Sequence, residues 1–195
     1  MNKEHVISAV IETLTENIPD SYVSTIFYYS IIGIIASLLG VNDYNVVILA
    51  VLAALLHRVV DTMDSMLGYK TEELYNIGFI PAHLDDVLNY IPARVSGMLI
   101  IISAAFLGLN WKGANYIMRR DARNCDSPNS GYTMATVAGA LNIQLEKEGV
   151  YTLGDNLHPL KVDCIEKAID IARLSIFLIT VFFFFVFMDL ILLQL

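Results

Sequence analysis

The sequence predicts an all-α integral membrane protein, a helical bundle with polar cytoplasmic loops and short amphipathic helices. Hydrophobic residues make up 56% of the 195 residues and charged residues only 16%, whereas a soluble domain carries about a quarter charged residues. The apolar residues also gather into long runs between polar stretches, and lipid covers apolar surface of that length. We expect a single membrane domain over 1–195, because no repeat or linker divides the chain.

Four apolar runs are expected to form the membrane helices: 22–41, 46–57, 95–109 and 174–195. The first has about 20 residues without a charge, enough to cross a hydrocarbon core of about 30 Å. A short amphipathic helix over 4–17 should precede it and stop near Pro19. The second run should leave the membrane near Arg58. The third run is short for a span, so we expect it to re-enter or to pair with 111–118 as a hairpin.

The distribution of charge sets the expected location and excludes one class of partner. A net charge of -8 argues against nucleic acid, whose phosphates demand a basic face. Of the 12 Lys and Arg residues, 8 lie in 110–173, and the positive-inside rule places that loop in the cytoplasm. Arg58 and Arg94 flank the middle polar loop, which suggests the same side. We therefore expect a multi-pass protein of the cell membrane with a cytoplasmic active face.

Several common sites are not indicated by the sequence. The four histidines form no i, i+4 pair, so we expect no structural metal site. Cys125 and Cys164 lie far apart and are expected to be reduced thiols. The sequence contains neither GxxxxGK[ST] nor GxSxG, which argues against a P-loop and a serine nucleophile.

Four polar clusters lie just outside the apolar runs. In the first, Glu12 and Glu16 share one helical face and should repel unless a cation lies between them; the alternative is a solvated face. In the second, Asp61 and Asp64 are three residues apart, a spacing that suits Mg²⁺ carrying phosphate oxygens. The alternative for the second pair is a cap or a turn.

The third cluster places Asp85 and Asp86 before Asn89 and Arg94. These residues could form another oxygen-rich site, or one aspartate could simply cap the following helix.

The fourth cluster places Arg119, Arg120 and Arg123 before a turn of sequence Ser-Pro-Asn-Ser-Gly at 127–131. Three arginines in five residues offer bidentate donors for phosphate or carboxylate, and the small turn residues allow backbone N–H groups to approach an anion. The alternatives are a positive-inside anchor and an ordinary loop.

In their order and spacing, the four clusters resemble the adenosylcobinamide-phosphate synthase family, integral membrane enzymes of cobalamin biosynthesis. The resemblance covers residues 8 to about 155. The matching positions are Glu12, Thr13, Glu16, Asn17 and Asp20; Arg58, Thr62, Met63, Asp64, Met66, Gly68 and Tyr69; Ala82, Leu84, Asp85, Asp86, Asn89, Pro92, Ala93 and Arg94; and Asp121, Ala122, Ser127, Pro128, Asn129 and Gly131. Asp61 stands where the family usually has Asn, and His83 where it usually has a basic residue.

The resemblance implies an ATP-dependent amide ligase. Such an enzyme joins aminopropanol or its O-phosphate to adenosylcobyric acid, giving adenosylcobinamide or its phosphate. The implied cofactors are Mg²⁺ and ATP, with Asp64, Asp85 and Asp86 as the metal ligands. The implied catalytic residues are Glu12, Glu16, Asp64, Asp85 and Asp86, and the implied substrate-binding residues are Asn17, Arg58, Tyr69, Asn89, Arg94, Arg120, Asp121, Arg123, Ser127 and Asn129.

Two other functions stay open from the sequence. One is a Mg-dependent membrane phosphotransferase that acts on a lipid diphosphate through the paired aspartates. The other is a non-catalytic, corrinoid-binding or accessory membrane subunit. Besides the corrinoid, the aminopropanol and membrane lipid, we expect one further partner, because family members begin with a longer N-terminal part: a second chain that supplies this part, or a homo-oligomer.

Overall fold

The structure, a computed structural model, describes residues 3–68 and 75–194. Its elements are α1 (Lys3–Asn17), the π-helix η1 (Ile18–Val23), α2 (Ser24–Leu38), α3 (Asp43–Leu67), α4 (Tyr75–Leu88), α5 (Tyr90–Phe106), α6 (Trp111–Asp121), α7 (Ser130–Leu141), β1 (Gln144–Lys147), β2 (Tyr151–Gly154) and α8 (Val162–Gln194). The expected helical membrane fold is confirmed, with one small β-hairpin added.

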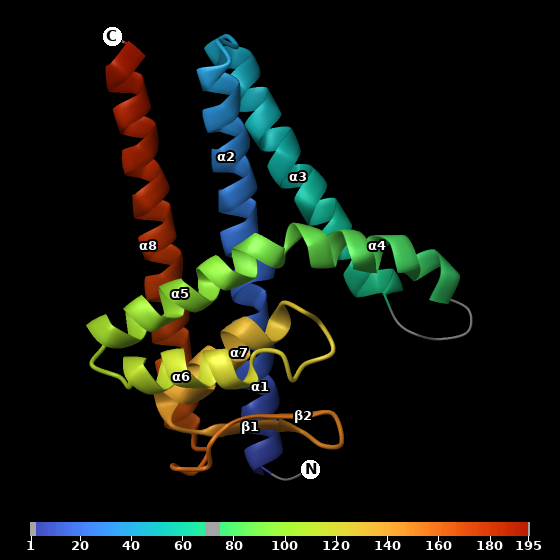
Figure 1. Ribbon diagram of the computed structural model, residues 1–195, viewed down its shortest axis with the longest axis vertical. Helices are drawn as coiled ribbons and strands as arrows, with labels where there is room; N and C mark the ends of the chain where they lie inside the picture. The colour runs from blue at the N-terminus through green and yellow to red at the C-terminus, as the bar shows by residue number, and fades with distance from the viewer. Residues whose placement is uncertain (1–2, 69–74, 195) are drawn as a thin grey trace.

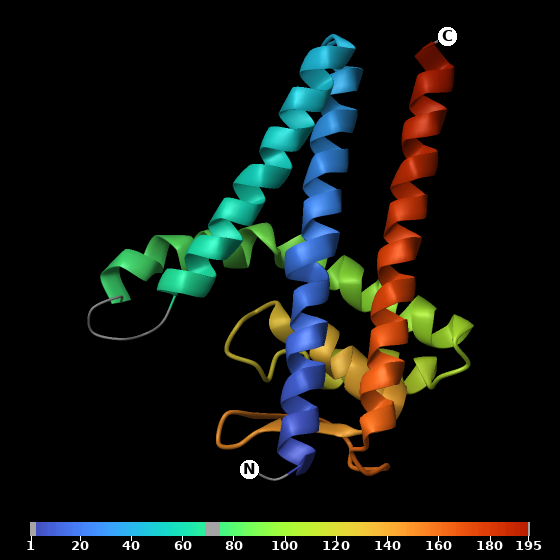
Figure 2. The same cartoon turned by 180° about the vertical axis from the view of Figure 1, so that it is seen from behind.

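Among the described residues, three helices are long and apolar enough to cross a membrane: Lys3–Leu38, Asp43–Leu67 and Val162–Met188. Figures 1 and 2 show α2, α3 and the C-terminal half of α8 extending together toward one end of the molecule, where the α2–α3 turn and the C-terminus lie. The turn uses Gly40 at a φ of +75°, and Asn42 caps α3 by accepting a hydrogen bond from the Asn45 N–H at 3.0 Å. The second apolar run ends before Arg58 in the sequence, but its helix continues to Leu67.

The first helix is also longer than expected. The sequence predicted a stop near Pro19, yet α1, η1 and α2 form one run from Lys3 to Leu38. Pro19 stands in the first turn of η1, and the wider π-turn there closes with a hydrogen bond from Ser24 N–H to the Pro19 carbonyl. The prediction was wrong because a π-turn lets the helix pass through the proline.

The third apolar run does not form a simple span. α4 and α5 meet at a bend of 47°. Pro92 has no N–H, so the Leu88 carbonyl lacks its helical donor, and the Tyr28 hydroxyl donates to it instead at 2.8 Å. Figure 1 shows α5 running obliquely across the long helices and α6 turning back beneath it. Of the two expectations for 95–109, this arrangement matches the hairpin with 111–118.

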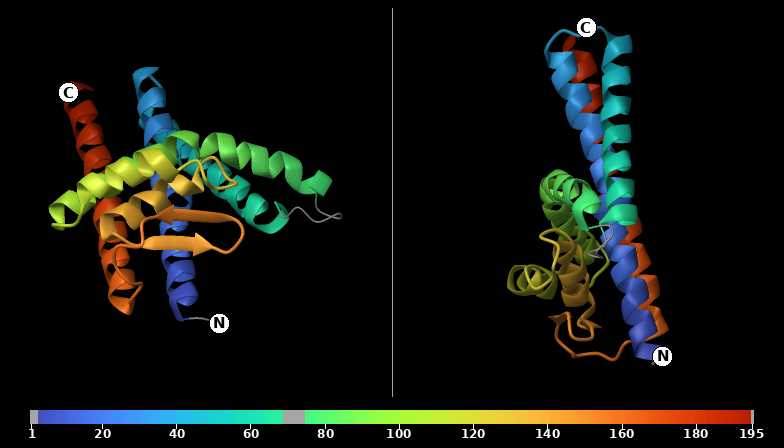
Figure 3. Two further views of the ribbon diagram at one scale, coloured as in Figure 1. Left: turned by 60° about the horizontal axis from the view of Figure 1, so that its bottom comes forward. Right: turned by 90° about the vertical axis from the view of Figure 1, so that its right-hand side faces the viewer.

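The elements α5, α6, α7 and the hairpin form a second layer against one face of the long helices, as the right-hand view of Figure 3 shows. The helix α7 is the centre of this layer, and Met134, Ala135, Val137 and Ala138 on it have no exposed surface. α6 crosses α7 closely, since a Cβ on Gly139 would lie 2.4 Å from the Gly113 carbonyl oxygen. This layer contains most of the polar stretch 110–173.

A β-hairpin within this polar stretch was not expected. The strands β1 and β2 pair antiparallel, with Leu145 opposite Leu153, and both leucines are fully buried. The three-residue connection 148–150 contains Gly149 at a φ of +72°, as hairpin loops of this length require. Each strand has one buried leucine, and so short an alternation of apolar and polar residues does not predict a strand from the sequence.

Candidate functional site

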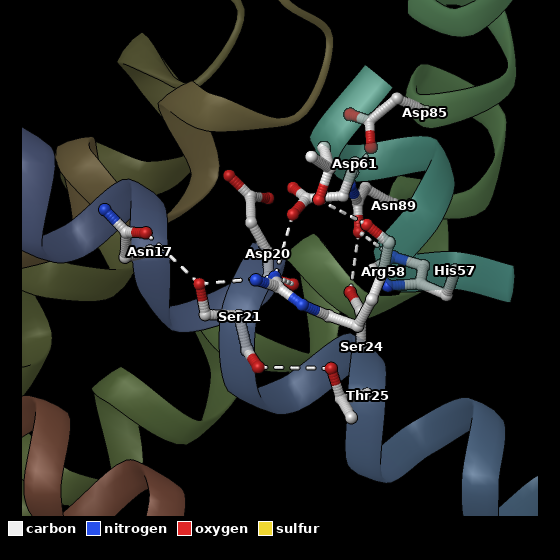
Figure 4. Close-up of polar contacts among 11 residues, drawn as sticks. Asn17, Asp20, Ser21, Ser24, Thr25, His57, Arg58, Asp61, Asp85 and Asn89 are labelled. Carbon is white, nitrogen blue, oxygen red and sulfur yellow. Dashed lines mark hydrogen bonds and ion pairs between the residues drawn. The ribbon is translucent and has the colours of Figure 1, made fainter. Parts of the chain in front are cut away.

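Five aspartates from three separated segments form what we call the carboxylate cluster: Asp20 from η1, Asp61 and Asp64 from α3, and Asp85 and Asp86 from α4. The charge of Asp20 interacts with those of Asp61, Asp64 and Asp85, and that of Asp85 with those of Asp61, Asp64 and Asp86. Figure 4 shows Asp20, Asp61 and Asp85 approaching one another from different segments. The first three clusters of the sequence therefore meet in space.

Arg58 ties α3 to η1 at the edge of the carboxylate cluster. Its Nη1 donates to Asp61 Oδ2 at 2.8 Å, to the Asp20 carbonyl at 3.3 Å and to Ser21 Oγ at 3.5 Å. Asn17 extends this network, because its Oδ1 accepts from Ser21 Oγ at 3.2 Å. Arg58 pairs with one of the five carboxylates, so the cluster keeps a surplus of negative charge that a cation would relieve.

Asn89, expected to bind substrate, lies inside the protein and is only 1% exposed. Its Oδ1 accepts hydrogen bonds from Ser24 Oγ at 2.6 Å and His57 Nε2 at 3.1 Å, and its Nδ2 donates to Asp85 Oδ1 at 2.9 Å. The amide therefore holds Asp85 in place. No sequence pattern pointed to His57, since a lone histidine in an apolar run is not distinctive.

The Ser-Pro-Asn turn docks beside the carboxylate cluster. Asn129 Nδ2 donates to the Asp86 carbonyl at 2.8 Å, and Ser127 Oγ lies 3.4 Å from Asp86 Oδ1. Ser127 Oγ also accepts from the Asn129 N–H at 3.2 Å, which stabilises the turn. The turn of the fourth cluster thus joins the other three at the end of α4.

Arg94 holds this turn from the other side. Its Nη1 donates to Asn129 Oδ1 at 3.1 Å, and its Nη2 lies 3.5 Å from the Pro128 carbonyl. The guanidinium lies between the rings of Tyr90 and Tyr132, at 3.4 and 4.2 Å from their centroids. These contacts occupy Arg94 with the protein itself, so its evident task is to position the turn.

Glu12 and Glu16 lie along α1, between the β-hairpin and the carboxylate cluster. Glu12 is buried; its Oε1 accepts from Ser8 Oγ at 2.5 Å and its Oε2 from the Tyr151 hydroxyl at 2.7 Å. Burial, followed by the hydrogen bond to Glu12, raises the pKa of Tyr151 well above its usual range. The charge of Glu16 interacts with those of Glu12 and Asp20, its neighbours one helical turn away on either side.

Arg120 and Asp121 belong to a different contact. Asp121 is 5% exposed and accepts hydrogen bonds from Arg120 Nε at 2.7 Å, Arg120 Nη2 at 2.8 Å and the Gly154 N–H at 2.8 Å. Arg120 also pairs with Asp155 at 3.0 Å. Burial acts to raise the pKa of Asp121, but the hydrogen bonds from Arg120 and Gly154 outweigh it, and the pKa is lowered. This network joins α6 to β2.

Arg123, Tyr69 and the metal site were also expected from the sequence. Arg123 is exposed and pairs with no acidic side chain in the parts of the chain that the structure describes. Tyr69 lies outside the described residues. Within 3–68 and 75–194, no three His, Cys, Asp or Glu side chains are arranged to hold a metal ion. Mg²⁺ nevertheless suits a surplus of carboxylate oxygens, because it binds through one or two carboxylates and keeps several waters.

Comparison with known proteins matches the chain to one family. The family model described as "CobD/Cbib protein" matches residues 1–177. The probable cobalamin biosynthesis protein CobD of Methanothermobacter thermautotrophicus is 45% identical over 180 residues, which cover 92% of this chain and 55% of that protein. Its counterpart in Methanocaldococcus jannaschii is 40% identical over 182 residues, 93% of this chain and 52% of that protein.

A bacterial relative gives the same result. The cobalamin biosynthesis protein CobD of Leptospira interrogans is 35% identical over 159 residues, which cover 82% of this chain and 45% of that protein. The chain thus spans about half the length of these curated relatives. No solved structure matches it significantly. The family match over most of the chain shows that it belongs to the CobD/Cbib family of cobalamin biosynthesis proteins.

Proposed function

We propose that the chain carries the amide-forming centre of a cobalamin biosynthesis enzyme, which joins aminopropanol or its O-phosphate to a carboxylate of adenosylcobyric acid. The observation that carries this proposal is the meeting of the carboxylate cluster with the Ser-Pro-Asn turn at the end of α4. Amide formation from an unactivated carboxylate needs activation. Bound ATP would supply this activation as a phosphoryl group on the carboxylate oxygen, and that group would leave as phosphate when the amine forms the C–N bond.

The carboxylate cluster is the proposed site for Mg²⁺ and the phosphates of ATP. One or two of Asp64, Asp85 and Asp86 would hold the ion together with water, and its charge would offset that of the transferring phosphoryl group. Asp61 is already paired with Arg58, so it is a less suitable ligand. The Ser-Pro-Asn turn, fixed by Arg94, lies next to Asp86 and offers a hydroxyl close to the same place.

Glu16 is the better candidate for holding the amine. Both carboxylate oxygens of Glu12 already accept hydrogen bonds from Ser8 and Tyr151, so Glu12 mainly joins α1 to the hairpin. Glu16 lies between Glu12 and Asp20 and interacts with the charge of Lys147, and within the described part of the chain its carboxylate accepts no such pair of bonds. As a carboxylate, Glu16 would attract the ammonium form and accept the proton released when the C–N bond forms.

The proposed anion-binding arginine is Arg123. The N–H groups of Arg94 and Arg120 already donate to oxygens of the protein itself. Arg123, in contrast, is exposed on the connection that leads into the Ser-Pro-Asn turn. It could meet an anionic oxygen of the substrate with two N–H groups at once.

We place this centre at the cytoplasmic face of the cell membrane. The basic residues concentrate in 110–173, and the elements of that stretch lie away from the end where the α2–α3 turn and the C-terminus lie (Figure 1). The positive-inside rule then favours the cytoplasm. The curated relatives are about twice as long as the part that this chain matches, so the proposal concerns the centre that this chain contributes and not the whole enzyme.

Complementation of a corrinoid auxotroph that lacks its own synthase tests the proposal. The chain is expressed alone and also in place of the matching segment of the Methanothermobacter relative, which supplies the remaining length. Native sequence should restore growth in at least one form, whereas Asp64→Asn or Asp85→Asn in that form should not. Asp163→Asn, an exposed aspartate of α8, is the matched control and should restore growth. Growth with both cluster variants would exclude the cluster from catalysis, and no growth with either native form would refute the enzymatic function.

A further inference from the structure

We infer that His57 is a positioning residue: its Nε2–H holds the Asn89 amide so that Asn89 presents its Nδ2 to the Asp85 carboxylate. The inference rests on the proposed function only for the catalytic consequence, because the hydrogen-bond chain itself is a feature of the fold. His57 lies in α3, outside the four polar clusters, and no comparison gives it a role.

The partners of Asn89 settle how its amide is turned. Asp85 Oδ1, 2.9 Å away, is an acceptor, so the atom facing it must be the amide nitrogen. The amide oxygen then faces Ser24 Oγ and His57 Nε2, at 2.6 and 3.1 Å, and can only accept from both. Nε2 must therefore carry the ring proton, which makes His57 the Nε2–H tautomer.

The surroundings of His57 favour this single arrangement. His57 is 2% exposed and Ser24 is fully buried. The Tyr28 ring stacks on the imidazole with centroids 5.2 Å apart. The other ring nitrogen, Nδ1, is buried and has no hydrogen-bond partner among the described residues. Burying Nδ1 without a hydrogen-bond partner costs less free energy when it carries a lone pair than when it carries an N–H. The neutral Nε2–H tautomer is therefore the stable one.

The chain of bonds lies at the break between α4 and α5. Asn89 is the residue between the two helices, and its backbone N–H donates to the Asp85 carbonyl at 2.8 Å. Tyr28 satisfies the Leu88 carbonyl, which Pro92 leaves without a helical donor. Tyr28 and His57 thus hold the α4–α5 break from one side. On the other side, Asn89 uses its Nδ2 to hold the Asp85 carboxylate.

Nitrogen NMR of the imidazole tests the bond without reference to any reaction. In native protein labelled with ¹⁵N-histidine, His57 should show the Nε2–H tautomer with an unprotonated Nδ1, assigned by its absence in His57→Gln. Asn89→Ala should shift the Nε2 signal. A protonated Nδ1, or an Nε2 signal that Asn89→Ala leaves in place, would overturn the inference.

Kinetics test the catalytic consequence in whichever form of the protein is active. The amide nitrogen of Gln reaches about as far as Nε2 and can donate to Asn89, whereas Leu cannot. His57→Leu should lower kcat by up to about 100-fold, the effect of a misplaced group, with little change in KM, and His57→Gln should recover most of the loss. His158→Leu, at an exposed histidine remote from the cluster, is the matched control.

The outcomes separate this inference from the proposed function. If native protein is active and His57→Leu is equally active, His57 does not position the cluster. If Gln fails to recover what Leu loses, the hydrogen bond is not the cause. If native protein is inactive in every form, the proposed function fails, and the NMR result still decides whether His57 holds Asn89.

Discussion

Replacement of Asp121 removes the charge that joins α6 to the β-hairpin. In Asp121→Asn, the remaining side-chain oxygen can still accept from the Gly154 N–H, but the amide NH₂ must face a guanidinium donor of Arg120. A hydrogen bond between charged groups contributes about 1.5–3 kcal/mol. Because 37% of the Arg120 side chain is exposed to solvent, we expect the lower end of that range, about 1.5 kcal/mol.

Asp121→Ala should cost more, because it also leaves the buried Gly154 N–H without an acceptor, which adds about 1–3 kcal/mol. Asp155→Asn is the matched control. Asp155 pairs with the same arginine but is 46% exposed, so its loss should cost under about 1 kcal/mol.

Thermal unfolding in mild detergent measures the ranking. At this chain length 1 kcal/mol corresponds to about 2–4 °C in Tm, so Asp121→Asn should lower Tm by roughly 3–6 °C. The pKa of Asp121 is lowered in the folded protein. Its stabilisation is therefore present above the ordinary carboxyl value of about 3.9 and is lost as the pH falls through the lower folded value. The Tm difference between native protein and Asp121→Asn should be steady from about pH 5 to 8 and shrink below about pH 4. An Asp121→Asn protein as stable as Asp155→Asn would refute this account of the α6–hairpin contact.

Three further predictions concern other parts of the fold. Gly139→Ala should destabilise the protein by about 1–3 kcal/mol through overpacking, since its Cβ would lie 2.4 Å from the Gly113 carbonyl; an unchanged Tm would show that α6 and α7 can separate freely. Asn89→Ala leaves two buried donors without an acceptor, at about 1–3 kcal/mol each; it should lower Tm far more than the exposed control Asn156→Ala, and equal losses would contradict the buried network. Burial raises the pKa of Cys125 to about 11, so at pH 8 only about 0.1% is thiolate, against about a quarter of an ordinary thiol; in a Cys164→Ala background, alkylation should be at least about 100-fold slower in folded than in denatured protein, and equal rates would contradict the burial.

Much of the fold follows from the sequence because lipid imposes a simple rule. An apolar run of about 20 residues with at most one charge has to be helical where lipid surrounds it, so 22–41 and 174–195, in which Asp189 is the one charged residue, were predictable. The errors lie where local geometry decides. Pro19 predicts a helix end on backbone grounds, but the π-turn of η1 absorbs it. Arg58 ends the apolar run but not the helix, since it pairs with Asp61 and α3 continues to Leu67.

The candidate site was predictable as a set of residues and less so as a set of roles. The resemblance to the family implied that Asp64, Asp85 and Asp86 act together, and in the structure their charges interact. Roles depend on burial and on partners distant in sequence, which no local pattern contains. Asn89 is internal because α2 and α3 pack over the α4–α5 break, and Arg120 meets β2 through a hairpin that the sequence did not predict.

If aspartates from separate helices form one functional centre, their substitutions should be coupled, and a double-mutant cycle on amide formation measures that coupling. Asp64→Asn, Asp85→Asn and the double variant are compared in the active form of the protein. Residues that act as a unit are non-additive, so each single variant should lose about 100-fold or more and the double variant should lose little beyond the larger single loss. Losses that multiply, or single variants with native activity, would contradict the claim.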